Sequence, residues 1–331
     1  MPGPERTGAR PVRLLDVAER AGVSKKTVSA VLNNVGQVRT TTRERVLEAV
    51  RDLDYRPNPA ALRLSSSRTG TVTLALPHLG SAEHAALASA VIDAGERAGV
   101  GVLCEPTGGS AAREADVLRA EVGSSDGVLL VPSSTEVDLP DGSVVVVLGD
   151  HDVGLPVDHV IASSSAATRR AVARLAAAGR RRIAVLRAPG GPASGPRWDD
   201  TSRADPAVVD VVVDADTGAA GDAAVRRLLA QDVRFDALVA GGEAVAFGAL
   251  HALRTHGLSV PADVAVVAVG GGPEAEFSRP SITTVAPDYD EMAAVALDWL
   301  LQRIAGDDAP ARYHEVALRT VERGSTPGPE R

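Results

Sequence analysis

Most of the chain alternates short apolar runs with alanine-rich stretches, and this alternation limits the fold more than any other feature. From Thr71 onward the runs are TVTLALP, VGVLCE, DGVLLVP, VVVVLGD, RRIAVLRA, VVDVVVD, DALVAGG and DVAVVAVGG. Runs that are apolar throughout are typical of strands buried on both faces, and helices between them allow parallel pairing. Their number is enough for two sheets. The sequence therefore predicts a two-lobed α/β core of parallel sheets over residues 71–326.

The first fifth of the chain has a helical periodicity instead. In LLDVAERAGVSKKTVSAVLNN, apolar residues recur at the spacing of two short amphipathic helices. Gly22 can end the first helix in a left-handed conformation, and the Ser24 hydroxyl can cap the second. A third helix is expected from about Thr41, which stands at capping-box spacing from Glu44. Two helices joined by a tight turn and followed by a third predict an all-α helix-turn-helix headpiece.

The charge is divided between these two parts. The whole chain has a formal net charge of -8, but residues 1–70 carry +6 and the remainder carries -14. A basic module on an acidic body suits a polyanion-binding head. Lys25 and Lys26 are the only lysines beside 33 arginines, and they stand in the first turn of the second helix. Lysines placed there can donate to guanine O6 and N7 in the major groove.

The headpiece motifs also support a family resemblance. DVAERAGVSKKTVSAVLN and the following TRERVLEAVRDLDYRPNPAA closely resemble the headpiece of the lactose-repressor (LacI-type) family, from about Arg13 to Leu64. The resemblance implies that Lys25 and Lys26 read bases. It implies further DNA contacts by Arg13, Ser24, Thr27, Ser29, Asn33, Thr42, Tyr55 and Asn58. Ala30 replaces an arginine that the family usually carries, which implies a different operator.

A hinge is expected between the headpiece (13–56) and the core. Pro57 and Pro59 end the third helix, and the serines up to Gly70 are typical of a linker, so the hinge spans 57–70. The resemblance implies that this segment folds into a short helix on double-stranded DNA and that Leu64 wedges into the minor groove. It also implies a homodimer on a pseudo-palindromic operator. A plain flexible linker is the alternative interpretation.

The core resembles the same family in RLAAAGRRRIAVL, GALHALRTHGLSVPADVAVVAVGG, SITTVAPDYDEMAAVALDWLL and VERGST. That family's core is similar to sugar-binding periplasmic proteins. The resemblance implies a first lobe of about 71–160 and 287–312, a second of about 161–286 and 313–326, and a helix containing Asp290 to Ile304 that returns to the first lobe. A ligand would bind between the lobes, at the carboxyl ends of the strands.

The expected ligand site lacks the usual polar anchors of that family. Gly242-Glu243 and Gly270-Gly271-Gly272 stand where acidic or amide pairs are common, and aromatic residues make up only 2% of the chain. We therefore expect a small-molecule effector that is not an ordinary hexose. The candidate pocket residues are Arg197, Trp198, Glu243 and Phe247. The alternative is a core that binds no ligand and serves only dimerisation.

Other classes of function find little support. No run approaches the roughly 18 apolar residues of a membrane span, and the N-terminus has no apolar signal core. The single cysteine, Cys104, has no partner for a disulfide, and no metal-ligand spacing or nucleophile elbow is present. Residues 270–275 (GGGPEA) formally match a dinucleotide-binding pattern, but Pro273 and Pro280 disfavour the long helix that should follow it. The sequence thus predicts a cytoplasmic transcription regulator, most simply a repressor, without catalytic activity. A cytoplasmic solute sensor that acts through a protein partner remains the competing class.

Overall fold

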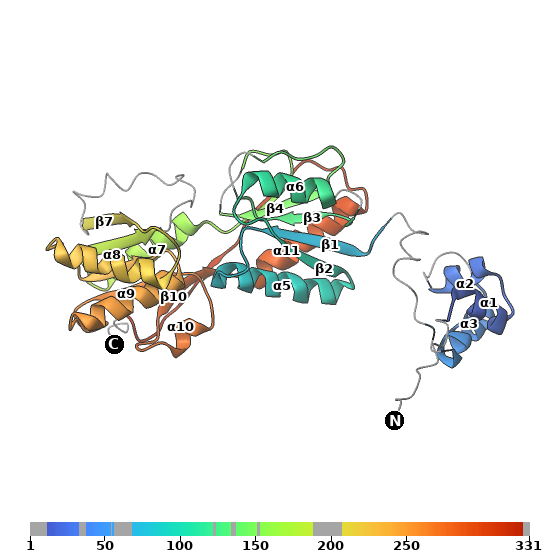
Figure 1. Ribbon diagram of the computed structural model, residues 1–331, viewed down its shortest axis with the longest axis horizontal. Helices are drawn as coiled ribbons and strands as arrows, with labels where there is room; N and C mark the ends of the chain where they lie inside the picture. The colour runs from blue at the N-terminus through green and yellow to red at the C-terminus, as the bar shows by residue number, and fades with distance from the viewer. Residues whose placement is uncertain are drawn as a thin grey trace, which may run out of the picture. The chain divides into compact units, whose positions relative to one another are not determined.

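The protein consists of two compact units. The computed structural model describes residues 12–32, 38–53, 55, 68–121, 124–133, 137–150, 153–187 and 207–326. The units are Met1–Thr69 and Gly70–Arg331, and the division falls at the end of the segment predicted as the hinge. Figure 1 shows the helices and strands of both units.

The N-terminal unit contains the three expected helices, α1 (Leu14–Ala21), α2 (Lys25–Leu32) and α3 (Thr40–Asp52). Gly22 has φ of 64° and ends α1. Ser24 Oγ accepts a hydrogen bond from the Thr27 N–H (3.1 Å) at the start of α2. The helices close on one small core of Val17, Ala18, Ala21, Val28, Val31, Val46, Ala49 and Tyr55. The helix-turn-helix prediction is confirmed.

The predicted cap of the third helix is wrong by two residues. The N-cap is Arg39, with extended backbone (ψ 140°) and no side-chain cap bond, so Thr41 already lies inside α3. The Thr42 N–H donates to the Arg39 carbonyl (2.9 Å), which completes the first turn without a capping box. The spacing of Thr41 and Glu44 matches a capping box, but the backbone enters the helix before Thr41 can serve as a cap.

The C-terminal unit is built on two six-stranded sheets. The first contains, in spatial order, β11 (Tyr313–Glu315), β5 (Asp158–Ile161), β4 (Val145–Gly149), β3 (Val128–Leu130), β1 (Thr71–Leu76) and β2 (Gly101–Pro106). The second contains β12 (Leu318–Val321), β10 (Thr283–Pro287), β9 (Ala265–Val269), β8 (Ala237–Ala240), β6 (Arg182–Arg187) and β7 (Ala207–Val212). All pairs are parallel except β10 with β12. The prediction of two parallel sheets is confirmed.

Helices cover both faces of each sheet, as Figure 1 shows. On the first sheet, α5 (Ala82–Ala98) and α11 (Tyr289–Ile304) pack on one face and α6 (Ala111–Glu121) on the other. On the second, α8 (Gly218–Ala230) and α9 (Glu243–Thr255) cover one face and α7 (Ser164–Ala177) the other. The short α10 (Glu274–Phe277) follows β9. Because α11 packs on the first sheet, the predicted return of this helix to the first lobe is confirmed.

The chain passes between the lobes three times, after β5, after β10 and after β11. The expected lobe boundary at residue 313 is wrong, since β11 (Tyr313–Glu315) pairs with β5 of the first sheet. Its partly exposed side chains gave no apolar run from which a strand could be recognised. All three passages leave a strand at its carboxyl end, so the carboxyl ends of both sheets face the junction of the lobes. No helix in the described parts of the chain is long and apolar enough to cross a bilayer.

Candidate functional site

The first turn of α2 presents a pair of cations to solvent. Lys25 and Lys26 are exposed, whereas Val28 and Val31 on the opposite side of the helix are buried in the headpiece core. The first turn contains no acidic residue. Two lysines at the positive end of a helix dipole oppose it, so this arrangement does not stabilise the helix. A phosphate or a guanine edge placed there would interact favourably with both ammonium groups and with the helix terminus.

Other predicted DNA contacts surround this turn to different extents. Thr27, Ser29 and Thr42 are half-buried, and Arg13 is exposed just before α1. The Ser24 hydroxyl lies 2.9 Å from that of Thr27, so it is already engaged within the cap. Tyr55 is only 8% exposed because its ring belongs to the headpiece core, and this burial raises the pKa of its hydroxyl. Asn33, Asn58 and Leu64 lie outside the described residues.

An exposed ion pair links the first and third helices of the headpiece. Arg20 of α1 contacts Asp52 at the end of α3, with 2.6 Å between Nη2 and the carboxylate oxygen. Both side chains are largely exposed, so the pair adds at most about 1 kcal/mol to stability. The buried apolar contacts therefore hold α2 in place, and the exposed polar face is left to bind a partner.

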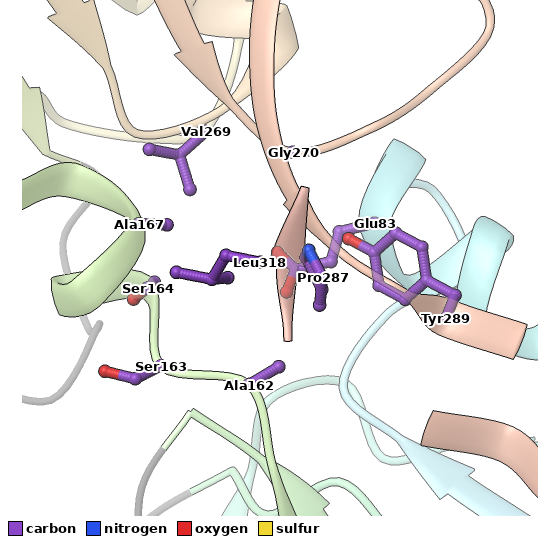
Figure 2. Close-up of a pocket in the computed structure, with 10 residues that line it drawn as sticks. All are labelled: Glu83, Ala162, Ser163, Ser164, Ala167, Val269, Gly270, Pro287, Tyr289 and Leu318. Atoms are coloured by element: carbon purple, nitrogen blue, oxygen red, sulfur yellow. The ribbon is translucent and has the colours of Figure 1, made fainter. Parts of the chain in front are cut away.

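A second candidate site is a pocket at the junction of the two lobes, drawn in Figure 2. Its empty volume is about 240 Å³ with its opening included. The lining combines residues from the three passages between the lobes with residues at strand ends: Glu83, Ala162, Ser163, Ser164, Ala167, Val269, Gly270, Pro287, Tyr289 and Leu318. The pocket lies between the lobes at the carboxyl ends of the strands, where ligands bind in this architecture.

The predicted effector residues occupy different environments. Glu243, in the first turn of α9, is 4% exposed and accepts a hydrogen bond from the Gly272 N–H (2.7 Å). Phe247, one turn further along α9, packs against the core of the second lobe. Neither Glu243 nor Phe247 lines the described pocket. Arg197 and Trp198 lie outside the described residues.

None of the ten lining residues was among the predicted effector residues. Two of the ten can ionise, Glu83 and Tyr289, and Figure 2 shows them on the same side of the pocket. Glu83 is exposed as a whole but lines the pocket on one side, where desolvation and the charges of Asp150 and Asp216 raise its pKa to about 7. The pKa of Tyr289 is raised by desolvation and by the carboxylates of Glu83 and Glu243. Glu83 follows β1 and Tyr289 follows β10. Their positions after strand ends were the one signal that could have identified them.

No group of three or more His, Cys, Asp or Glu residues among the described positions could hold a metal ion. Cys104 is half-buried against the first-lobe core, and burial raises the pKa of its thiol. A raised pKa leaves less thiolate at neutral pH and disfavours a nucleophilic role.

Comparison with known proteins finds similarity over both units. A family model for bacterial regulatory proteins of the lacI family matches residues 13–58, and a model for a periplasmic binding protein-like domain matches residues 172–326. The ribose operon repressor of Halalkalibacterium halodurans is 30% identical over 322 residues, which are 95% of this chain and 97% of the relative.

Solved structures extend this similarity. A LacI-family regulator from Sanguibacter keddieii has 35% identity and a TM-score of 0.70, and the match covers 79% of this chain and all of that one. The lac repressor dimer bound to operator and the anti-inducer ONPF has a TM-score of 0.79 over 96% of this chain and 99% of that chain. At 24% sequence identity, this structural similarity shows a common fold.

Proposed function

Since the chain belongs to the LacI family of bacterial regulatory proteins, and is thus a DNA-binding transcription repressor and not an enzyme, we propose that it acts as a cytoplasmic homodimer on a pseudo-palindromic operator. The observation that carries the proposal is the exposed pair Lys25 and Lys26 in the first turn of α2, above a buried core that fixes the helix. One such helix reaches only a few base pairs, so two headpieces on a symmetric site are needed for specific binding.

In this proposal the two lysines donate to base edges in the major groove and the neighbouring polar residues contact phosphates or bases. These neighbours are Arg13, Ser24, Thr27, Ser29, Asn33, Thr42, Tyr55 and Asn58. Leu64 of the hinge wedges into the minor groove at the centre of the operator. The acidic core stays away from the phosphates, because residues beyond the first 70 carry a net charge of -14.

The proposed regulator responds to a small effector in the interlobe pocket. The ribose operon repressor is named for a sugar operon, but we propose an effector other than an ordinary hexose for this chain. The pocket is small, and Tyr289 is the one aromatic residue among its described lining residues. Arg197, Trp198, Glu243 and Phe247 remain proposed effector-binding residues. An effector that prefers one arrangement of the lobes would change operator affinity through that preference.

The test is selection of bound DNA from a random duplex library by the full-length protein at near-physiological salt. We expect an enriched pseudo-palindrome with a flexible pyrimidine-purine step at its centre, where a leucine wedge opens the stack most easily. An enriched single half-site would contradict the dimer. Uniform recovery of all sequences would contradict base reading by α2.

A further inference from the structure

Carboxylates of both lobes lie near the junction where the interlobe pocket is found. Glu83 and Asp150 belong to the first lobe, and Glu83 lines the pocket itself. Asp216, Glu243 and Glu274 belong to the second lobe. A methyl group on Gly272 would contact the Oε2 atoms of Glu243 and Glu274 and would also lie 3.2 Å from Cβ of Ala82. Because Ala82 begins α5 of the first lobe, Glu243 Oε2 points at the surface where the lobes meet.

These acidic groups repel one another in the absence of a ligand. The charges of Asp150 and Asp216 both raise the pKa of Glu83, and desolvation raises the pKa of Asp216. Desolvation and the charge of Glu274 raise the pKa of Glu243, against the opposing hydrogen bond from Gly272. The carboxylates stand at or near the N-termini of α5, α7, α8, α9 and α10, but each helix terminus supplies only about half a positive charge. The termini therefore offset only part of the negative charge.

Two buried polar atoms at this site lack a partner. Glu243 Oε2 and Tyr289 Oη are fully covered and have no hydrogen-bond partner among the described residues. Arg323 is the cation that lowers the pKa of Glu243, but its guanidinium already donates to the Ile282 carbonyl (2.8 Å) and the Thr284 hydroxyl (3.1 Å). A covered acceptor without a donor is costly, and native structures rarely leave one unexplained. A ligand that carries N–H donors would satisfy Glu243.

We infer that the effector is a small organic cation, with a protonated amine or guanidinium group that lies between Glu83 of the first lobe and Glu243 of the second. This inference rests on the proposed effector-regulated function. A metal ion fits less well, since no group of three ligating side chains among the described residues can hold one. A cation between opposed carboxylates replaces repulsion between the lobes with attraction, so it favours their closed arrangement.

The test is calorimetric titration of the full-length protein at pH 8 without DNA, because amines also bind phosphates. The probes are putrescine, agmatine and glucosamine, with 1,4-butanediol, glucose and ribose as neutral counterparts and MgCl2 as the metal arm. We expect at least one amine to bind and its neutral counterpart not to bind. E83Q and E243Q should each raise its Kd at least about tenfold, because each removes one charge that the amine contacts.

Two further variants separate the effect of charge on binding from the effect of space. E96Q removes an exposed carboxylate further along α5 and should leave the Kd unchanged. Gly272→Ala keeps all charges but fills the space beside Glu243 and Glu274, so it should also weaken binding. Thermal unfolding of each variant identifies any that fail to fold.

Three results would overturn the inference: no binding by any of the amines, amine binding that E83Q and E243Q leave unchanged, or binding of ribose or Mg²⁺ in place of the amines. Operator selection is measured separately. Loss of amine binding with intact selection contradicts only the cationic effector, whereas failed selection with intact amine binding contradicts the proposed operator function.

Discussion

Lys25 and Lys26 lie together in one exposed helical turn that contains no acidic residue. If they read bases, Lys25→Ala or Lys26→Ala should reduce the preference for the selected operator over random DNA by about 1–3 kcal/mol. Competition binding at fixed salt measures this preference. Arg51→Ala, in the last turn of α3, is the control and should weaken binding to both DNAs equally or not at all. Equal losses on both DNAs for the lysine variants would show that they contact only phosphates.

Asp158 is a buried carboxylate of the first lobe that pairs with two arginines. Its side chain is fully buried and accepts hydrogen bonds from Arg303 (2.7 and 2.9 Å) and Arg312 (2.8 Å). Asp158→Asn leaves two half-buried guanidinium groups without their anion and should lower the free energy of unfolding by about 3 kcal/mol in urea denaturation. Asp116→Asn breaks an exposed pair with Arg119 and should cost less than about 1 kcal/mol. Similar losses in both variants would contradict this assignment.

The same residue predicts an acid limit of stability. Burial raises the pKa of Asp158, but the hydrogen bonds from Arg303 and Arg312 outweigh it, so the pKa lies below its ordinary value. The unfolded chain therefore binds a proton at higher pH than the folded chain, and the stabilisation by this carboxylate is present above about pH 4 and is lost below it. Urea midpoints from pH 6 down to pH 3 should fall for the wild type and fall less for Asp158→Asn.

At the scale of helices, the two expected caps of the headpiece make opposite predictions. Ser24 accepts from the Thr27 N–H, so Ser24→Ala should cost about 1 kcal/mol and speed hydrogen exchange at the Thr27 amide. Thr41 is exposed and already inside α3, so Thr41→Ala should cost a few tenths of a kcal/mol at most. Thermal unfolding of the two variants measures both effects. A larger loss for Thr41→Ala would reinstate the capping box.

The headpiece helices were predictable from their helical periodicity and eight of the twelve described strands from continuous apolar runs, whereas β5, β10, β11 and β12 were not identified as strands. The buried runs of β1, β4, β8 and β9 follow directly from continuous apolar sequence. β11 was not predictable, because Tyr313 and Glu315 are exposed on a short edge strand whose pairing depends on the fold. Lys25 and Lys26 could be identified from local sequence alone. Glu83 and Tyr289 could not, because they come together only after distant strands have paired.

At the scale of the whole core, the interlobe carboxylates should make its stability fall with pH near neutrality. The folded pKa of Glu83 is about 7, raised by desolvation and by Asp150 and Asp216, and its side chain also faces Tyr289. Between the ordinary pKa near 4.5 and this value, the folded state binds more protons than the unfolded state, so stability decreases as pH rises through that window. E83Q removes the charge that causes the decrease. The Tm of E83Q should therefore equal that of the wild type at pH 4.5 and exceed it at pH 8. If the two Tm values were also equal at pH 8, the carboxylates of the two lobes would not repel one another. An amine that binds should raise the Tm of the wild type at pH 8, because it neutralises the opposed carboxylates. It should have little effect on the Tm of E83Q, in which the substitution has already removed one of these charges.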